Sequence, residues 1–143
     1  MENVQIVVYS ENSFSIPHWV DEEMLKDKQV AVNINSLLRY KDGADAVGCQ
    51  IRVLYTADNK TVMEYAAVLT VVIEGWAEIL KNNPGKEEII AASREAWVQT
   101  IDFVRGAICV NAMKSGNELV SRYILPTVNV DKFLPSIAIE KTV

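Results

Sequence analysis

The side chains able to do acid–base or metal chemistry are few, and none belongs to a recognisable catalytic or metal-binding pattern. His18 is the only histidine, which excludes a histidine-rich metal site. A nucleophile–histidine–acid triad would have to use this residue beside Pro17 in a loop, and nothing near it supports one. Cys49 and Cys109 lie in apolar patterns without the CxxC spacing of zinc ligands. They are interpreted as reduced core thiols of a cytoplasmic protein.

Carboxylates in a pattern suited to general acid–base catalysis are not found either. Glu64 and Glu74 fall on the same face of an expected strand, but they are ten positions apart and are expected to face solvent. Glycines are scattered at turns and helix ends, so the sequence has no glycine-rich loop of the kind that holds phosphates. The sequence therefore predicts no enzyme, no cofactor and no metal.

The composition is that of one globular domain covering residues 1–143. Half of the residues are hydrophobic and the net charge is −5, so the chain has enough apolar content for a single core. An acidic chain without clusters of basic and aromatic residues is a poor partner for nucleic acid. The N-terminus does not read as a signal peptide, and the most apolar segment, residues 65–73, is too short to span a membrane. We therefore expect a cytoplasmic protein.

Alternation of apolar and polar residues predicts four strands, over residues 3–16, 29–41, 46–56 and 61–76. Tight turns at Asp42-Gly43 and Asp58-Asn59-Lys60 join the last three strands, which predicts an antiparallel meander. The first strand joins this meander through the crossing segment 17–28. Val7 and Tyr9 make the second face of the first strand partly apolar, which is a hint that this face is covered as well.

Residues 87–116 are the only long segment with helical periodicity. At about 1.5 Å per residue this helix would be about 45 Å long, more than the domain needs to cover its own sheet. Its apolar face is wide because two rows of apolar residues contribute to it. The main row is Ile90, Trp97, Ile101, Val104, Ile108 and Ala112, and the second is Ile89, Ala96, Phe103, Ala107 and Val110. Burial on two sides, by the sheet and by a partner, explains this width as well as a thick core helix in a monomer does.

Large apolar residues also stand at the ends of elements and in the non-periodic tail that follows the helix, where the core needs them least. Exposed apolar patches on an acidic protein usually form a protein-binding groove or an oligomer interface. The alternative is that these residues pack into one core. They are Trp19, Met24, Leu25, Trp76, Tyr123, Phe133 and Ile137.

The predicted fold is α+β, with a four-stranded antiparallel sheet followed by one long helix packed on it and a short C-terminal segment. This element order resembles the SecB family of export chaperones over nearly the whole chain, and short motifs support the resemblance. Residues 101–105 (IDFVR) are similar to the aromatic-x-Arg segment in the middle of the family's helix, and residues 14–18 (FSIPH) to its exit from the first strand. Residues 114–116 (KSG) and 125–133 (LPTVNVDKF) are similar to its helix end and its entry to the last helix.

The resemblance implies an ATP-independent holdase that wraps non-native polypeptides in apolar grooves. By position, the apolar residues at element ends and in the tail would line the client groove. The resemblance also implies a homotetramer built as a dimer of dimers, with the helices between two sheets. The residues at that oligomer interface would be Trp97, Ile101, Val104 and Ile108. Transfer of clients to the export motor SecA is a further implication.

Two features differ from the family. Its final helix is longer than Pro135 allows here, and the acidic sheet surface on which SecA docks is replaced by a mixture of acidic and basic residues. One alternative is therefore a dedicated chaperone of a single partner, such as an antitoxin. Another is a SecB-fold structural or small-ligand-binding protein without general chaperone activity, whose groove is filled by its own tail.

Overall fold

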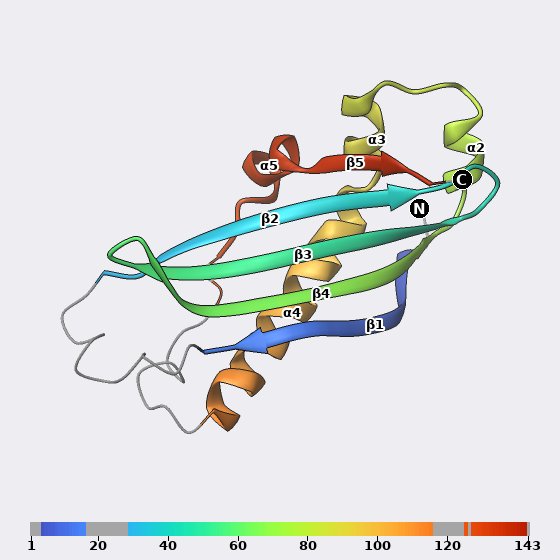
Figure 1. The fold of residues 1–143 in the computed structure, drawn as a ribbon. Helices are drawn as coiled ribbons and strands as arrows, with labels where there is room; N and C mark the ends of the chain where they lie inside the picture. The colour runs from blue at the N-terminus through green and yellow to red at the C-terminus, as the bar shows by residue number, and fades with distance from the viewer. Residues whose placement is uncertain (1–3, 17–28, 116–124, 126, 143) are drawn as a thin grey trace.

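The fold is a β-sheet with a long helix across one of its faces. The computed structural model describes residues 4–16, 29–115, 125 and 127–142. Figure 1 shows helix α4 (Arg94–Lys114) crossing behind the sheet at an angle to the strands. The predicted α+β class, with a long helix packed on a sheet, is confirmed.

Five strands form one mixed sheet in the order β1–β4–β3–β2–β5. The first four pair antiparallel, as the alternation and the short turns predict, and their boundaries lie close to the expected ones. The strands are β1 Val4–Ser15, β2 Ala31–Tyr40, β3 Ala46–Ala57, β4 Lys60–Ile73 and β5 Ala138–Lys141.

Both turns of the β2–β3–β4 meander lie where the sequence predicts them. Gly43, in the turn before β3, has φ 80°, a conformation that glycine adopts without steric cost. Asp58 and Asn59 also have positive φ, 51° and 64°, as the two central residues of a type I′ hairpin turn do. This turn type matches the right-handed twist of the strands, so it helps to fix the register of β3 against β4.

The C-terminal segment contains a strand that the sequence does not predict. β5 pairs in parallel with β2, with Leu37 opposite Ala138 and Tyr40 opposite Lys141. The expected sheet of four antiparallel strands is therefore a mixed sheet of five. A four-residue strand shows too little alternation to be recognised, and its pairing depends on the short helices α5 (Val130–Phe133) and η2 (Leu134–Ser136) that lead the tail back to the sheet.

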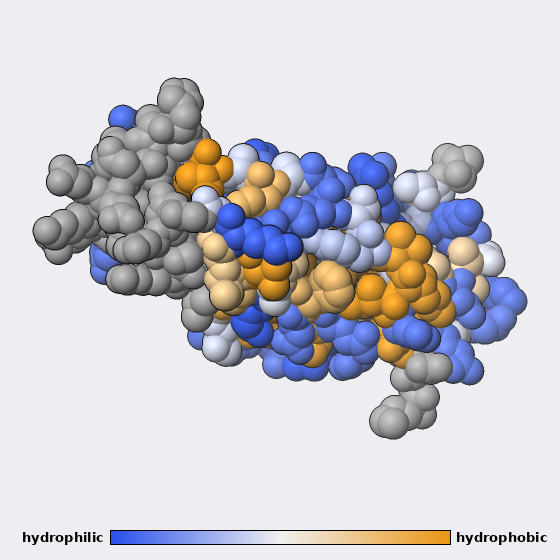
Figure 2. Space-filling model, turned by 90° about the horizontal axis from the view of Figure 1, so that it is seen from below, coloured by the Kyte–Doolittle hydropathy of each residue, from blue (hydrophilic) through white to orange (hydrophobic). Residues whose placement is uncertain are grey.

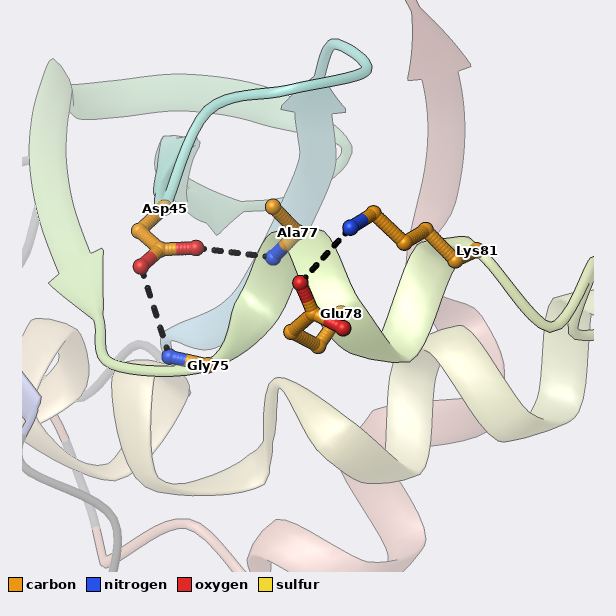
Figure 3. Close-up of polar contacts among 5 residues, drawn as sticks. All are labelled: Asp45, Gly75, Ala77, Glu78 and Lys81. Carbon is orange, nitrogen blue, oxygen red and sulfur yellow. Dashed lines mark hydrogen bonds and ion pairs between the residues drawn. The ribbon is translucent and has the colours of Figure 1, made fainter.

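The last strand of the meander ends before residue 76, where the sequence places its end. The chain turns at Gly75, with φ 85°, into the short helix α2 (Trp76–Leu80). The Asp45 carboxylate accepts hydrogen bonds from the backbone N–H groups of Ala77, at 2.8 Å, and Gly75, at 3.4 Å (Figure 3). It satisfies donors that the first turn of a helix leaves free. Because α2 is held in this way, the Trp76 side chain lies in the core.

The helix expected over residues 87–116 is interrupted at Ser93, between α3 (Lys86–Ala92) and α4. The Ser93 hydroxyl donates to the carbonyl of Ile90 at 2.7 Å. Its N–H is shared between the carbonyls of Ile89 and Ile90, both at 3.1 Å. A serine hydroxyl that bonds a carbonyl of the preceding turn competes with the regular α-helical pattern, which accounts for the break. The expected end of the helix, residue 116, lies outside the described residues.

A single hydrophobic core forms between the helices and the inner face of the sheet. On α4 the main apolar row faces this core, and Trp97, Val104 and Ile108 have no exposed surface. On the facing strand β4, alternate residues from Met63 to Ile73 are fully buried as well. Burial of this apolar surface is the main stabilising contribution to the fold. The main apolar row of the helix thus packs in the core of a single chain.

Candidate binding surface

An open groove lies between the edge strand β1 and helix α4, with a volume of about 470 Å³. Tyr9 and Glu11 line it from the strand. The helix lines it with side chains that are exposed or only partly buried, so the groove is open to solvent along its length. The helical lining residues are Phe103, Gly106, Ala107, Val110, Asn111 and Lys114.

The large apolar side chains that stay exposed in the described part of the chain all belong to β1 or α4. Phe103 is 41 % exposed and Val110 is 50 % exposed, and Met113 on the same helix is 70 % exposed. Val7 and Val8 on β1 are about half exposed. Figure 2, a view from the side of β1, shows an elongated hydrophobic band bordered by hydrophilic side chains. On an acidic chain, an apolar surface of this kind is typical of a protein-binding site.

Beside the groove, β1 presents a free backbone edge. It is the end strand of the sheet, and among the described residues it pairs only with β4. The register of that pairing shifts between Ile6 and Val8, where Val7 has no opposing partner. Glu11 is the only charged residue of the strand, which contains none of the lysines or prolines that commonly protect sheet edges. Beyond Val4, whose carbonyl accepts a hydrogen bond from the Gln99 amide at 3.0 Å, the outer N–H and C=O groups of β1 can therefore pair with another extended chain.

Polar side chains form a hydrogen-bonded chain across the groove. The Tyr9 hydroxyl donates to the Glu11 carboxylate at 3.0 Å, and the Asn111 amide donates to the same oxygen at 3.3 Å. The Tyr9 hydroxyl also contacts the hydroxyl of Tyr65, which lies fully buried in β4. Tyr9 has a single hydroxyl hydrogen and gives it to Glu11, so Tyr65 is the donor in this second bond. The network joins β4, β1 and α4 at one point.

The environment of the two tyrosines keeps both of them protonated. Burial is the main cause that raises the pKa of Tyr9, and the neighbouring Glu11 carboxylate raises it further. Burial is also the main cause that raises the pKa of Tyr65, followed by its hydrogen bond to Tyr9. Hydroxyls with raised pKa values keep their protons through neutral and mildly alkaline pH. The network therefore joins β1 and α4 through hydroxyls that carry their protons.

Three of the predicted client-binding residues lie in the described part of the chain, and all three are buried. Trp76 and Ile137 have no exposed area and Phe133 is 8 % exposed, because α2 and the tail fold back onto the core. The Trp76 ring contacts Tyr40 and the Phe133 ring contacts Trp97, both edge-on. The remaining predicted client-binding residues lie outside the described part of the chain and are Trp19, Met24, Leu25 and Tyr123.

The predicted oligomer-interface residues lie on the side of α4 that packs on the sheet. Trp97, Val104 and Ile108 are fully buried, and Ile101 is 3 % exposed. Their side chains make the core of a single chain, so they have no surface to offer another copy. They share one buried face of the helix, and the exposed apolar surface of α4 belongs to Phe103, Val110 and Met113.

Sequence reasoning misses Phe103 and Val110 as site residues, although it recognises the second apolar row to which they belong. A similar signal exists in the first strand, where Val7 and Tyr9 are apolar residues on the face that alternation gives to solvent. Both signals indicate that a second face is covered. Periodicity alone does not tell which of two adjacent rows on a helix the sheet occupies.

A second cavity, of about 460 Å³, lies where the β2–β3 turn, α2, the start of α3 and the end of β5 meet. Tyr40, Leu80 and Ile89 give it an apolar wall. At its rim the Lys141 ammonium and the Asp42 carboxylate are 2.7 Å apart, and both side chains are more than half exposed. Because these charges already pair with each other, they do not single out a class of small ligand.

Cys49, one of the two free cysteines, is buried. Burial raises the pKa of the Cys49 thiol to about 12, so this thiol stays protonated at physiological pH. Within the ranges that the structure describes, histidine, cysteine and acidic side chains nowhere form a group able to hold a metal ion. No described helix is both long enough and apolar enough to cross a membrane.

Comparison of the chain with protein-family models and with curated proteins gives no match. The site is an open, mainly apolar groove beside a free strand edge, with a polar network that fixes the two walls against each other.

Proposed function

We propose that this protein is a SecB-like holdase, an ATP-independent cytoplasmic chaperone that binds non-native polypeptides on the surface formed by β1 and α4. The observation that supports this best is the exposed apolar groove between these two elements. Phe103 and Val110 stand on its helical wall, Tyr9 and Glu11 on its strand wall, and the free edge of β1 lies beside it. The surface is long and open, which suits an extended chain better than a compact small molecule.

An unfolded polypeptide has both kinds of group that this surface can use. Its apolar side chains would cover Phe103 and Val110, and its backbone would pair with the outer edge of β1. Burial of apolar area contributes about 25 cal/mol per Å² and requires no particular direction of approach. Binding of this kind tolerates many client sequences, as a general holdase requires.

The proposal includes a homo-oligomer, the dimer of dimers that the resemblance to SecB implies. Because the predicted interface residues are used inside the chain, a second copy would meet exposed residues of α4 outside the groove, such as Met113. Transfer of clients to SecA is left out of the proposal. Instead of an excess of acidic groups, the strands present paired charges, with Arg52 2.8 Å from Glu64 and Arg39 3.7 Å from Glu140.

The second candidate is a structural protein whose apolar surface is covered by another copy of the chain. The near absence of charge on the β1 edge favours it, because two such strands can pair antiparallel about a two-fold axis. Burial of Phe133 and Ile137 in the core fits this candidate too, since a tail packed in this way is not available to clients. In this assembly the groove would be closed.

Aggregation suppression separates the two candidates. A chemically denatured enzyme is diluted into buffer without ATP, and light scattering is followed with and without this protein. The holdase proposal expects suppression at near-stoichiometric amounts and its loss in the Phe103→Ser/Val110→Asp variant. Ala91→Asp changes an exposed residue of α3 outside the groove and is the matched control. Sedimentation of each variant gives its assembly state.

Each outcome has a distinct meaning. A wild-type dimer that suppresses nothing, together with a monomeric double variant, would replace the holdase by the structural candidate. If the protein suppressed the aggregation of only one of many denatured proteins tested, its function would be that of a dedicated chaperone. Suppression that survives in the double variant would move client binding away from the groove.

A further inference from the structure

The edge of β2 is occupied by the chain's own C-terminal strand, as an added peptide strand occupies the edge of a sheet. β5 runs parallel to β2 from the Leu37–Ala138 pair to the Tyr40–Lys141 pair. Beyond the strand, the Thr142 N–H donates to the carbonyl of Tyr40 at 2.7 Å. The two strands are distant in the sequence, so the tail behaves toward this edge as a tethered ligand.

The tail is anchored in the core before β5 by Phe133 and Ile137, whereas the contacts of β5 itself are shallow. Ile137, directly before β5, is fully buried in the core. After it, Glu140 lies 3.7 Å from Arg39 and Lys141 lies 2.7 Å from Asp42, and all four side chains are about half exposed or more. Ion pairs between exposed side chains contribute little to stability. A four-residue edge strand held in this way opens more readily than the long antiparallel strands beside it.

We propose that the edge of β2 is a second polypeptide-binding site, which β5 fills until an extended client segment replaces it. The occupant is a strand-forming stretch with apolar residues at alternate positions, as Ile137 and Ile139 are in the tail. The first of these apolar side chains would enter the position of Ile137, while the client backbone takes over the ladder with β2. This inference rests on the proposed holdase function and adds a site to it.

Competition from the tail makes this second site selective. A tethered strand competes at a high effective concentration. A client segment therefore displaces β5 only if its own pairing with β2 is more stable. The β1 edge, by contrast, is free in the described chain. Weakly strand-forming clients would be held at β1 alone, and strongly strand-forming clients at both edges of the sheet.

A disulfide that fixes β5 to β2 tests the exchange. Arg39 and Glu140 are paired in the ladder and both are exposed, so Arg39→Cys with Glu140→Cys places two thiols opposite each other. A Cys109→Ser background leaves Cys49, which is buried, as the only other thiol. The probe is a fluorescent peptide with the sequence of residues 134–143, LPSIAIEKTV, whose binding is followed by anisotropy.

The oxidised staple should bind this peptide about tenfold more weakly than the reduced form, and reductant should restore binding. The matched control is an Asn35→Cys/Arg52→Cys staple, which joins β2 to β3 and leaves β5 free. It should bind the peptide equally in both redox states. Equal binding by the oxidised and reduced forms of the β5 staple would overturn the proposal.

A loosened tail provides the opposite test. Lys141→Glu with Thr142→Pro removes the ion pair to Asp42 and the hydrogen bond to Tyr40, and should strengthen peptide binding about tenfold. Lys86→Glu, an exposed residue of α3, is the charge control. If the loosened variant instead forms a dimer that the peptide dissociates, the occupant is the β5 strand of a second copy, and the client assignment is overturned.

The peptide measurement tests strand exchange at β2, and the aggregation measurement tests the holdase function, so either proposal can be rejected without the other. Peptide exchange controlled by the staple, without suppression of aggregation, would reject the holdase function and leave strand exchange at β2 in place. Suppression that is the same for the oxidised and reduced staple would keep the holdase and reject β2 as a client site. Displacement of the peptide by an unfolded client, lost on oxidation, is the result that supports both.

Discussion

The ring of Tyr9 on β1 lies 4.6 Å from the ring of Phe103 on α4, measured between centroids, with the planes tilted by 51°. The hydroxyl of the same tyrosine donates to Glu11 and contacts Tyr65. One side chain thus makes an apolar contact with the helix and polar contacts within the sheet. We infer that Tyr9 sets the spacing between the two walls of the groove.

Val110→Asp should weaken client binding and leave the fold intact. Val110 is half exposed, so a charge at this position stays in contact with water, and the free energy of unfolding should change by less than about 1 kcal/mol. A client would have to bury that charge against its apolar side chains, which is unfavourable. Suppression of light scattering should therefore fall sharply relative to Ala91→Asp. Equal suppression by the two variants would contradict client binding at the groove.

Ile108→Ala and Val110→Ala should differ strongly although the two residues are close neighbours on α4. Ile108 is fully buried, and its truncation should lower the free energy of unfolding by about 2–5 kcal/mol. Val110 is exposed, and its truncation should cost less than about 0.5 kcal/mol. Urea unfolding followed by tryptophan fluorescence measures both. Similar costs at the two positions would mean that α4 is rotated relative to the sheet.

The hydroxyls of Tyr9 and Tyr65 should be coupled in stability. Tyr9→Phe removes the acceptor of a buried hydroxyl and should lower the free energy of unfolding by about 1–3 kcal/mol. Tyr65→Phe leaves the Tyr9 hydroxyl with Glu11 as its partner, so it should cost less. The double variant should lose less than the sum of the two single changes. Strict additivity in urea unfolding would show that the hydroxyls do not interact.

Stability should fall at alkaline pH, in part through Cys49, whose pKa rises from 9.0 to about 12 because the thiol is buried. The unfolded thiol ionises near pH 9.0, whereas the folded thiol keeps its proton up to about pH 12. Between these values the unfolded state binds fewer protons, so the free energy of unfolding falls by about 1.4 kcal/mol per pH unit for this group. Below pH 9.0 the contribution is fully present.

Urea midpoints at pH 8 and pH 10.5 measure this loss. Cys49→Ala should show a smaller decrease than the wild type over the same interval. Part of the decrease should remain, because the pKa values of Tyr9 and Tyr65 are also raised by burial. Identical decreases in wild type and variant would mean that the Cys49 thiol is accessible to solvent in the folded state.

The sequence is sufficient to predict the antiparallel part of the sheet and the inner face of the helix. Turn residues such as Asp58 and Asn59, with alternation on either side, determine a hairpin locally. Helical periodicity places Trp97 and Ile108 in one apolar row of the helix, and the structure shows that this row is buried. These features depend on neighbours in the sequence.

The features that sequence reasoning misses depend on tertiary contacts. β5 is too short to show a period, and it exists because the edge of β2 accepts it. Trp76 lies at the end of an expected strand, where the sequence suggests an exposed position. In the structure it begins α2, whose first turn is bonded to Asp45, and its side chain is buried in the core. The role of Phe103 depends on its contact with Tyr9, which is remote in the chain. Composition and residue spacing do not predict contacts between residues that are remote in the sequence.

The order of the strands delays the folding of β1 during synthesis. Val4 pairs with Ile73, so β1 has no partner in the sheet until β4, which follows β2 and β3 in the sequence, has been made. Translation at about 5–20 residues per second makes this wait several seconds long. The strands β2, β3 and β4, joined by short turns, can pair as they emerge. A nascent chain thus carries a nearly uncharged strand without a partner, and crowded polysomes are where its misassociation with neighbouring nascent chains would begin.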